Sequence, residues 1–390
     1  MKLLLWPALL ALSLPGNGLG AALSTGLEDD ARTVLSYGPR VAGSPAGEQA
    51  RLYLEAQFRA LGYQTRREAF TYPRFDDLGS EVRAGHQVLR GYALQNSAGG
   101  EVTALSVRVP GVGSAANYVG LDVRGKVAVV SRGQTTFLQK VRAAAEAGAA
   151  GVVIVNSAAG ELRGTLGEQA ELPVLGVSSD VGAALTDGLP LTLSVRVRRG
   201  EVQGVNLVAF KAGLTGPDLL LGGHLDSVLG APGANDNLSG SLAVLEVARR
   251  VANTPLSARS FFALFDGEED GLRGSRAFVK ANAPSLERLK AMFNFDMVGV
   301  AAQPLTLGGD AKLTGVAQRV SSAAVNDAAP GGSDHVPFAE AGVPTLFFHR
   351  GLDANYHQPG DSLLDLELVR GTVDTALSIA AEVLSPAVAR

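Results

Sequence analysis

The sequence contains no cysteine, only five histidines and few aromatic residues, which make up 6% of its 390 positions. Without cysteine, the chain can form neither disulfides, nor thiolate metal sites, nor a cysteine nucleophile. Any metal ion must therefore be bound by histidine and carboxylate side chains. Four of the five histidines lie in the second half of the chain; the full set is His86, His224, His335, His349 and His357.

A strong charge of one sign is also lacking, since 34 basic residues stand against 38 acidic ones and the net charge is −4. The basic residues are scattered along the chain, so we expect no nucleic-acid partner. Hydrophobic residues make up 46% of the sequence and charged residues 18%, proportions that are typical of a globular protein. The length allows two domains, or one large domain that carries an insert.

Only one long apolar run occurs, and it lies at the N-terminus. Lys2 precedes an uncharged run from Leu3 to Leu14, and a Pro-Gly-Asn-Gly break and small residues follow it. This order predicts a signal peptide over residues 1–22, although an uncleaved anchor is an alternative. No other stretch approaches the ~20 apolar residues of a membrane-spanning helix. We therefore expect a secreted or periplasmic protein with no stable membrane insertion after cleavage.

The remaining sequence divides into three segments that differ in their pattern of predicted helices and strands. Residues 23–85 indicate two helices and an extended segment, and residues 86–200 indicate a small α/β module with short strands and no catalytic cluster. In residues 201–390, short apolar runs alternate with helical patterns such as 238–251 and 366–384. This alternation predicts an α/β fold with a doubly wound, mainly parallel mixed sheet and helices on both faces, plus a small inserted α/β domain.

Acidic residues and histidines follow the apolar runs of the last segment. Ligand sites in open α/β sheets gather at the carboxyl ends of strands, so we expect these side chains to converge. Two imidazoles and three carboxylates suit two divalent ions of hard-to-borderline character, with one carboxylate between ions ~3.5–4 Å apart. The predicted metal-binding set is His224, Asp236, Glu269, Asp296 and His357.

Each of these short segments also has a simpler explanation when it is taken alone. Asp236 precedes a predicted helix and could be an ordinary N-cap, and His224 could lie in a surface turn. The acids around Glu268 and Glu269 could form a solvated loop, but like charges so crowded at a strand end repel unless something positive neutralises them. Asp296, in an apolar run predicted as a strand, is costly to bury unless it is paired. Taken together, the segments favour a metal centre.

Three segments carry a resemblance to a known family. Leu221–Ser227, Gly233–Gly240 and Ser333–Phe338, in this order, resemble the zinc aminopeptidases of peptidase family M28, over residues 23–85 and 203–390. Val123–Val130 and Ala147–Val153 resemble a protease-associated (PA) domain, which would make residues 86–200 an insert in the peptidase domain.

The resemblance implies a role for each site residue. Asp236 would bridge two zinc ions, His224 and Asp296 would complete one site, and Glu269 and His357 the other. Glu268 would be the general base, and Asp226, two positions from His224, would orient its ring. Tyr356 would donate to the oxyanion, and the peptide bond after Asp236 would be cis. The implied substrate is a peptide or protein with a free N-terminus.

Three other functions fit the same residues. A glutaminyl cyclase-like acyltransferase would share the ligand types. A carboxypeptidase-like relative would need a basic anchor, for which Arg273 and Arg350 are the candidates. A non-enzymatic binding protein on a peptidase fold would be expected to lose ligands that this sequence retains. His335, in the Ser-Asp-His segment, would shape the substrate pocket, whereas His86 is expected to be structural or exposed.

Overall fold

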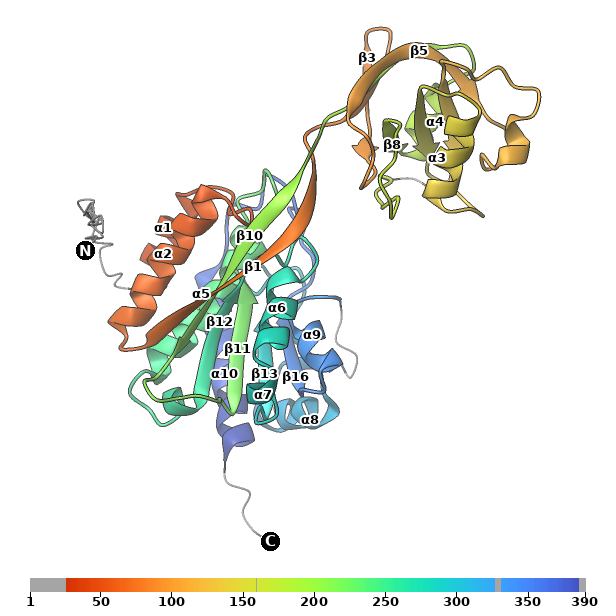
Figure 1. Cartoon of the computed structure of the whole chain (residues 1–390). Coiled ribbons are helices and arrows are strands. Elements are labelled where there is room, and N and C mark those ends of the chain that lie inside the picture. Colours follow the sequence, from red (N-terminus) through yellow and green to blue (C-terminus); the bar gives the residue numbers. More distant parts are fainter. Residues whose placement is uncertain (1–25, 159, 327–330, 386–390) are drawn as a thin grey trace, which may run out of the picture. The chain divides into compact units, whose positions relative to one another are not determined.

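The structure is a computed structural model that describes residues 26–158, 160–326 and 331–385 (Figure 1). The described residues form two compact units, one built from those up to Tyr72 and from Gln203 onward, the other from those within Pro73–Val202. The predicted signal peptide at residues 1–22 lies outside the described residues. None of the described helices combines the length and the apolar character that a membrane crossing requires.

The first unit is built on an eight-stranded mixed sheet. Its central strands β12, β11, β13 and β16 run parallel to one another, whereas β10 is antiparallel to β12 and β14 is antiparallel to β16. The strand order confirms the predicted doubly wound, mainly parallel sheet: β1 (Gln64–Asp77), β10 (Val197–Phe210), β12 (Ser260–Phe265), β11 (Leu219–His224), β13 (Ala291–Phe295), β16 (Thr345–His349), β14 (Thr306–Gly309) and β15 (Ala324–Asn326).

Helices cover both faces of this sheet because its central strands are apolar on both sides. Leu219 and Leu221 of β11 belong to one hydrophobic core and Leu220 to the other, as alternation along a strand requires. The first core contains residues of α1 (Leu27–Leu35), α2 (Pro45–Ala60), α5 (Ser239–Val251), α8 (Ala311–Val320) and α10 (Leu366–Leu384). The second contains residues of α6 (Arg273–Ala281), α7 (Ala283–Leu286) and α9 (His335–Glu340).

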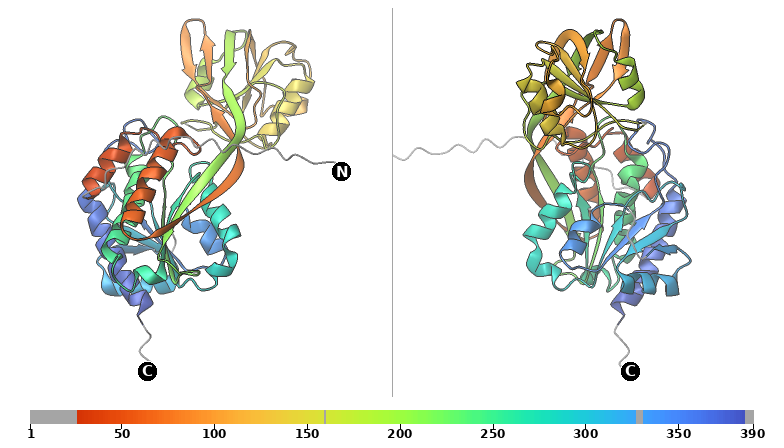
Figure 2. Two further views of the ribbon diagram at one scale, coloured as in Figure 1. Left: turned by 60° about the vertical axis from the view of Figure 1, so that its left-hand side comes forward. Right: turned by 90° about the vertical axis from the view of Figure 1, so that its right-hand side faces the viewer.

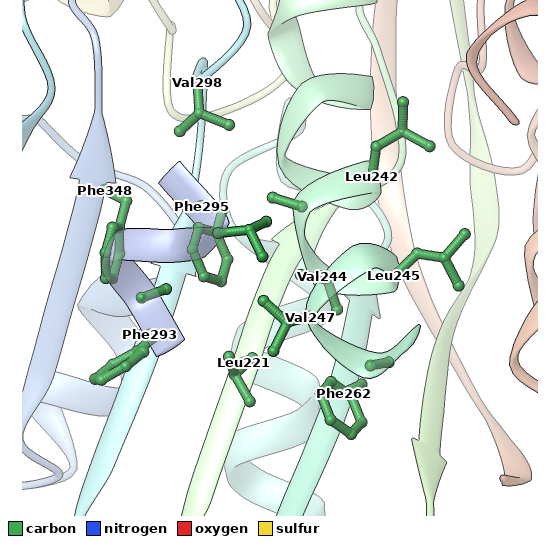
Figure 3. Packing of buried hydrophobic residues seen from close by; sticks show 14 of the residues in the cluster. Leu221, Leu242, Val244, Leu245, Val247, Phe262, Phe293, Phe295, Val298 and Phe348 are labelled. Atoms are coloured by element: carbon green, nitrogen blue, oxygen red, sulfur yellow. The ribbon is translucent and has the colours of Figure 1, made fainter. Parts of the chain in front are cut away.

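Aromatic and branched side chains fill the first core. Figure 3 shows Leu221 and Phe262 of neighbouring strands beside Val244 and Val247 of α5. All four side chains are completely or almost completely buried. Full burial of such side chains stabilises the folded state by about 1.5–3 kcal/mol each, so this core provides a rigid base for the loops at the strand ends.

The observed boundaries follow local sequence signals. The helix α2 begins after Ser44, whose hydroxyl accepts a hydrogen bond from the Gly47 amide, and α10 begins after Asp365, whose carboxylate caps Glu367. The strand β13 ends at Phe295, so Asp296 follows the strand and does not lie within it as the apolar pattern predicted. An aspartate at this position is placed by the sheet but belongs to the loop beyond it.

The second unit has its own eight-stranded sheet, which Figure 2 shows from two sides. Its strands β5, β6, β7 and β8 run parallel, and separate hydrophobic cores contain their two sets of side chains. In sheet order the strands are β3 (Gln87–Arg90), β2 (Glu81–Ala84), β9 (Pro190–Val195), β5 (Gly100–Arg108), β6 (Val127–Ser131), β7 (Gly151–Val155), β8 (Val174–Val177) and β4 (Tyr92–Ala93). The helices α3 (Phe137–Glu146) and α4 (Ser179–Ala184) complete the unit.

Candidate metal centre

The predicted site residues lie at one edge of the sheet, at the ends of its central strands. His224 is the last residue of β11, Glu268 and Glu269 lie in the turn after β12, and Asp296 directly follows β13. Because β11 pairs in parallel with both β12 and β13, the three strand ends point the same way. Two further loops reach this edge, namely the turn η2 (Ala234–Leu238) and the segment between β16 and α10 that carries His357.

The five predicted ligands meet around one carboxylate. Asp236 Oδ1 lies 3.2 Å from His224 Nε2, and Asp236 Oδ2 lies 3.2 Å from His357 Nε2. His357 Nε2 is in turn 3.0 Å from Glu269 Oε2, and His224 Nε2 is 3.6 Å from Asp296 Oδ1. The two oxygens of Asp236 therefore face two different imidazoles, each of which has a further carboxylate beside it.

Glu268 lies at the same centre, slightly farther from the nearer imidazole. Its Oε2 is 3.9 Å from His224 Nε2. Two groups of side chains place one ligand atom each within 4.8 Å of one another, and either could hold a cation: His224, Asp236 and Glu269, or His224, Glu268 and Asp296.

The Asp226 carboxylate binds the backbone of the turn that carries Glu268 and Glu269, and it lies farther from the His224 ring. Its Oδ1 accepts a hydrogen bond from the Glu268 amide at 3.1 Å, and its Oδ2 accepts one from the Glu269 amide at 3.2 Å. The His224 ring contacts Asp226 mainly through the main chain, since Nδ1 lies 3.1 Å from the carbonyl oxygen and 3.7 Å from the carboxylate. One buried carboxylate thus fixes the backbone of both glutamates.

Tyr356 packs on the neighbouring His357. The two rings are stacked, with centroids 3.8 Å apart and planes at 23°. His357 has a left-handed backbone with φ of 57°, and Met297, directly after Asp296, has φ of 54°. Residues with side chains seldom adopt this region, and such outliers cluster at functional sites.

Burial and charge shift the titration of the cluster strongly. Burial alone would lower the pKa of His224, but the charges of Glu268 and Asp296 raise it well above its ordinary value. Burial raises the pKa of Glu268 well above the usual range. Burial would also raise the pKa of Asp236, but the adjacent imidazoles of His224 and His357 hold it below the usual range. Carboxyl groups packed this closely have to be neutralised, either by protons or by cations.

The donor atoms fit divalent metal ions. Among the described residues, His224 Nε2, Glu269 Oε1 and Asp296 Oδ1 are buried and have no hydrogen-bond partner. Buried polar atoms are normally paired, because an unpaired one costs about 1–3 kcal/mol. A bound cation would give such donor atoms the partner that they lack. Imidazole nitrogen together with carboxylate oxygen is a common ligand set for zinc.

Several supporting residues had no role in the sequence analysis. Asn237 Oδ1 accepts the amides of Gly240 and Met297, and its Nδ2 donates to the Phe295 carbonyl at 2.8 Å. Ser333 Oγ donates to Asp296 Oδ2 at 2.7 Å. Both residues lie in the motifs that carry the resemblance, but nothing in their spacing shows which backbone groups they bind. The peptide bond between Asp236 and Asn237 is cis, as the resemblance implies.

The remaining candidates do not join the ligand set. The His335 ring is buried and stacks on Phe347 with centroids 4.5 Å apart. His349 Nδ1 contacts the Asp296 carbonyl oxygen at 2.8 Å. The Arg273 Nε donates to the Asp270 carbonyl, and the Arg350 guanidinium reaches Thr372 at 3.5 Å. His86 is exposed in the turn between β2 and β3.

Comparison with known proteins identifies the family of this chain. Residues 206–383 match the description "Peptidase family M28", and residues 92–185 match a PA domain. The chain is 31% identical to aminopeptidase YwaD of Bacillus subtilis over 84% of its own length and 77% of that protein.

Two solved structures extend the comparison. An aminopeptidase from Aneurinibacillus sp. strain AM-1 superposes with a TM-score of 0.74 at 30% identity, over 91% of this chain and 93% of that one. BSAP, a zinc aminopeptidase from Bacillus subtilis, gives 0.72 at 26% identity over 92% and 95%.

The α/β fold, the histidine and carboxylate cluster and these likenesses define an enzyme of the metallopeptidase class, a peptide hydrolase. The chain belongs to peptidase family M28 and carries a PA domain as an insertion. The resemblance found in the sequence is confirmed.

Proposed function

We propose that the chain is an exported aminopeptidase that uses two zinc ions. The observation that carries the proposal is the position of Asp236, whose two oxygens each lie 3.2 Å from a different imidazole nitrogen. A carboxylate placed in this way can bridge two ions. The similarity to proteins named as aminopeptidases, one of them a zinc aminopeptidase, supports the same reaction.

In this proposal, each ion has an imidazole, a further carboxylate and the shared Asp236. His224 and Asp296 would hold one ion, and His357 and Glu269 the other. The unpaired Glu269 Oε1, His224 Nε2 and Asp296 Oδ1 would find their partners there. Ser333 and Asn237 would fix the loops that present these ligands, as supporting residues of zinc sites commonly do.

Zinc ions bound here would lower the pKa of a coordinated water and polarise the scissile carbonyl. Glu268 would accept the proton of the attacking water and return it to the leaving amine. Because burial raises the pKa of Glu268, its carboxylate is a stronger base than an exposed one. Burial and nearby acids raise the pKa of Tyr356, so its hydroxyl stays protonated and can donate to the developing oxyanion.

The charge of the centre also favours a substrate amine over a substrate carboxylate. Five acids, namely Asp226, Asp236, Glu268, Glu269 and Asp296, surround two histidines. Two divalent ions would neutralise about four of these charges, and a free α-ammonium group complements the negative charge that is left. A carboxypeptidase-like enzyme would instead need a basic anchor, but of the two candidates Arg273 donates to the Asp270 carbonyl and Arg350 is directed to Thr372. An N-terminal substrate is therefore the better match.

Export rests on the N-terminal sequence. A basic residue, an apolar run of 12 residues from Leu3 to Leu14 and small residues up to Ala22 form the pattern of a signal peptide. Processing after residue 22 would release the peptidase and its PA domain outside the cytoplasm. N-terminal sequencing of the protein from the culture fluid or periplasm tests this point.

Three measurements test the proposed activity. Elemental analysis should find two zinc ions per chain. Aminoacyl anilides with a free amino group should be cleaved, and the same compounds with an acetylated amino group should not. Glutaminyl peptides should be hydrolysed without release of pyroglutamate. Cleavage of the blocked anilides alone, or pyroglutamate as the main product, would contradict the proposal.

A further inference from the structure

Arg40 is a fully buried cation that binds main-chain carbonyls of the metal centre. It lies between α1 and α2 and is 0% exposed. Its guanidinium donates from Nε to the Leu225 carbonyl at 2.8 Å, from Nη1 to Pro232 at 2.6 Å and from Nη2 to Gly233 at 2.7 Å. Its backbone joins the same segment, since its amide donates to Ser227 Oγ at 3.0 Å.

An arginine in this position is unusual, because a buried guanidinium normally pairs with a carboxylate. Within the described ranges, Arg40 forms no ion pair, and all three of its guanidinium hydrogen bonds go to main-chain oxygens. Burial lowers the pKa of Arg40 to about 10, against the opposing charges of Asp226 and Asp361, so the side chain remains charged at neutral pH. Three hydrogen bonds to backbone carbonyls stabilise this buried charge.

The bonded carbonyls belong to the segment that joins two predicted zinc ligands. Leu225 directly follows His224, and Gly233 lies three residues before Asp236. Gly233 has a left-handed φ of 66°, and a side-chain carbon on it would lie 2.5 Å from both the Asp236 carbonyl oxygen and Ser227 Cβ, and 3.1 Å from Arg40 Nη2. Glycine is therefore needed for this turn, which places the backbone directly against the guanidinium.

Asp361 holds the other end of the same segment. It is 3% exposed, and its Oδ1 and Oδ2 accept the amides of Asn235 and Asp236 at 2.7 and 3.0 Å. Its own carbonyl oxygen accepts the Ala234 amide at 3.1 Å. The carbonyls of the segment are thus bound by a buried arginine and its amides by a buried aspartate.

We propose that Arg40 is a positioning residue of the metal centre, which, with Asp361 at the other end, fixes the chain between His224 and Asp236 and so sets the affinity for zinc. The proposal rests on the proposed two-zinc function. Arg40 touches neither the substrate nor the ligand atoms; it acts through the loop on which they lie.

The direction of the change in zinc affinity distinguishes a positioning role of Arg40 from a purely electrostatic one. A positive charge near the site repels a zinc ion, so removal of the Arg40 charge should by itself strengthen zinc binding. Loss of the three hydrogen bonds should instead free the loop and weaken binding. Residues that support zinc ligands change metal affinity by roughly 10- to 100-fold when they are mutated. If Arg40 acts by positioning, the weakening must outweigh the lost repulsion.

The test is zinc binding by the full-length protein, measured by competition with a chelating dye. Arg40→Met removes both the charge and the donors, and Arg40→Lys keeps the charge but cannot reproduce the planar fork. We expect the dissociation constant of at least one zinc ion to rise roughly 10- to 100-fold in both variants. Circular dichroism of the metal-free proteins checks that they are folded.

The matched control is Lys140→Met in the second unit. Lys140 is also 0% exposed and binds the Val112 and Gly133 carbonyls at 2.5 and 2.8 Å, but no ligand segment. We expect it to lower thermal stability and leave zinc affinity unchanged.

The experiment distinguishes failure of this inference from failure of the proposed function. Unchanged or tighter zinc binding in Arg40→Met overturns the inference; if that variant does not fold, unchanged binding in Arg40→Lys does so. Failure of the wild-type protein to bind two zinc ions would instead contradict the proposed function.

Discussion

Replacement of Glu268 by glutamine separates a general base from a metal ligand. The glutamine side chain has the same shape but cannot accept a proton from water. Glu268 Oε2 lies 3.9 Å from the nearer imidazole nitrogen, Asp296 Oδ1 lies 3.6 Å from it, and the Glu269 and Asp236 oxygens lie 3.0–3.2 Å from theirs. Glu268 is the farthest of these carboxylates and is assigned as the base in the proposed function, so Glu268→Gln should keep both zinc ions.

General base catalysis contributes about 10²- to 10⁴-fold to the rate, which corresponds to about 3–5 kcal/mol in the activation barrier. We therefore expect kcat on a free aminoacyl anilide to fall by that factor in Glu268→Gln, with zinc affinity within about threefold of wild type. Glu269→Gln is the matched control and should lose zinc as well as activity. Equal zinc loss in both variants would make Glu268 a ligand, and undiminished kcat in Glu268→Gln would refute its role as base.

Three other predictions follow from burial and from the ligand set. Burial lowers the pKa of His335 to about 4, below about 6.5 for an unfolded histidine. The free energy of unfolding should therefore fall by up to about 3 kcal/mol as the pH falls between these two values, because the unfolded state binds the proton first. Urea unfolding at pH 7 and 4.5 should show this decrease in the wild type and not in His335→Phe. Phe293→Ala, at a site 0% exposed beside Phe348, should cost about 3–5 kcal/mol in the same assay. Zinc at a hundredfold excess over its dissociation constant should stabilise the EDTA-treated protein by about 3 kcal/mol for each ion bound in thermal unfolding, and no shift would contradict a preformed site.

The fold was predictable where strands are continuous apolar runs and helices have clear caps. The helix α10 has the predicted bounds of 366–384, because it is a long uninterrupted pattern. The strand β14 was not predicted, since its four residues, Thr306–Gly309, include two glycines and give no periodic signal. Short strands of this kind are defined by their neighbours; β14 pairs antiparallel with β16.

The convergence of the candidate ligands was predictable for the same reason that the parallel sheet was. Acids and histidines that follow buried strands have to meet at one edge. The residues that hold the loops were not predictable, because their partners are main-chain groups far along the chain. Arg40 binds carbonyls 185 to 193 positions away, and neither its spacing nor its neighbours in the sequence indicate this.

The wide distribution of these residues has a consequence for folding. Arg40 stands before the inserted unit, His224 and Asp236 follow it, and His357 and Asp361 come after the last strand of the first sheet. Contacts over such long sequence separations form slowly, because a large loop must close before they stabilise anything. During synthesis, the PA domain can therefore be complete while the peptidase still lacks its final ligand. In the proposed two-zinc site, full zinc binding has to wait until the ribosome has released the chain well beyond Asp361, so the peptidase is inactive while its C-terminal part is still being made.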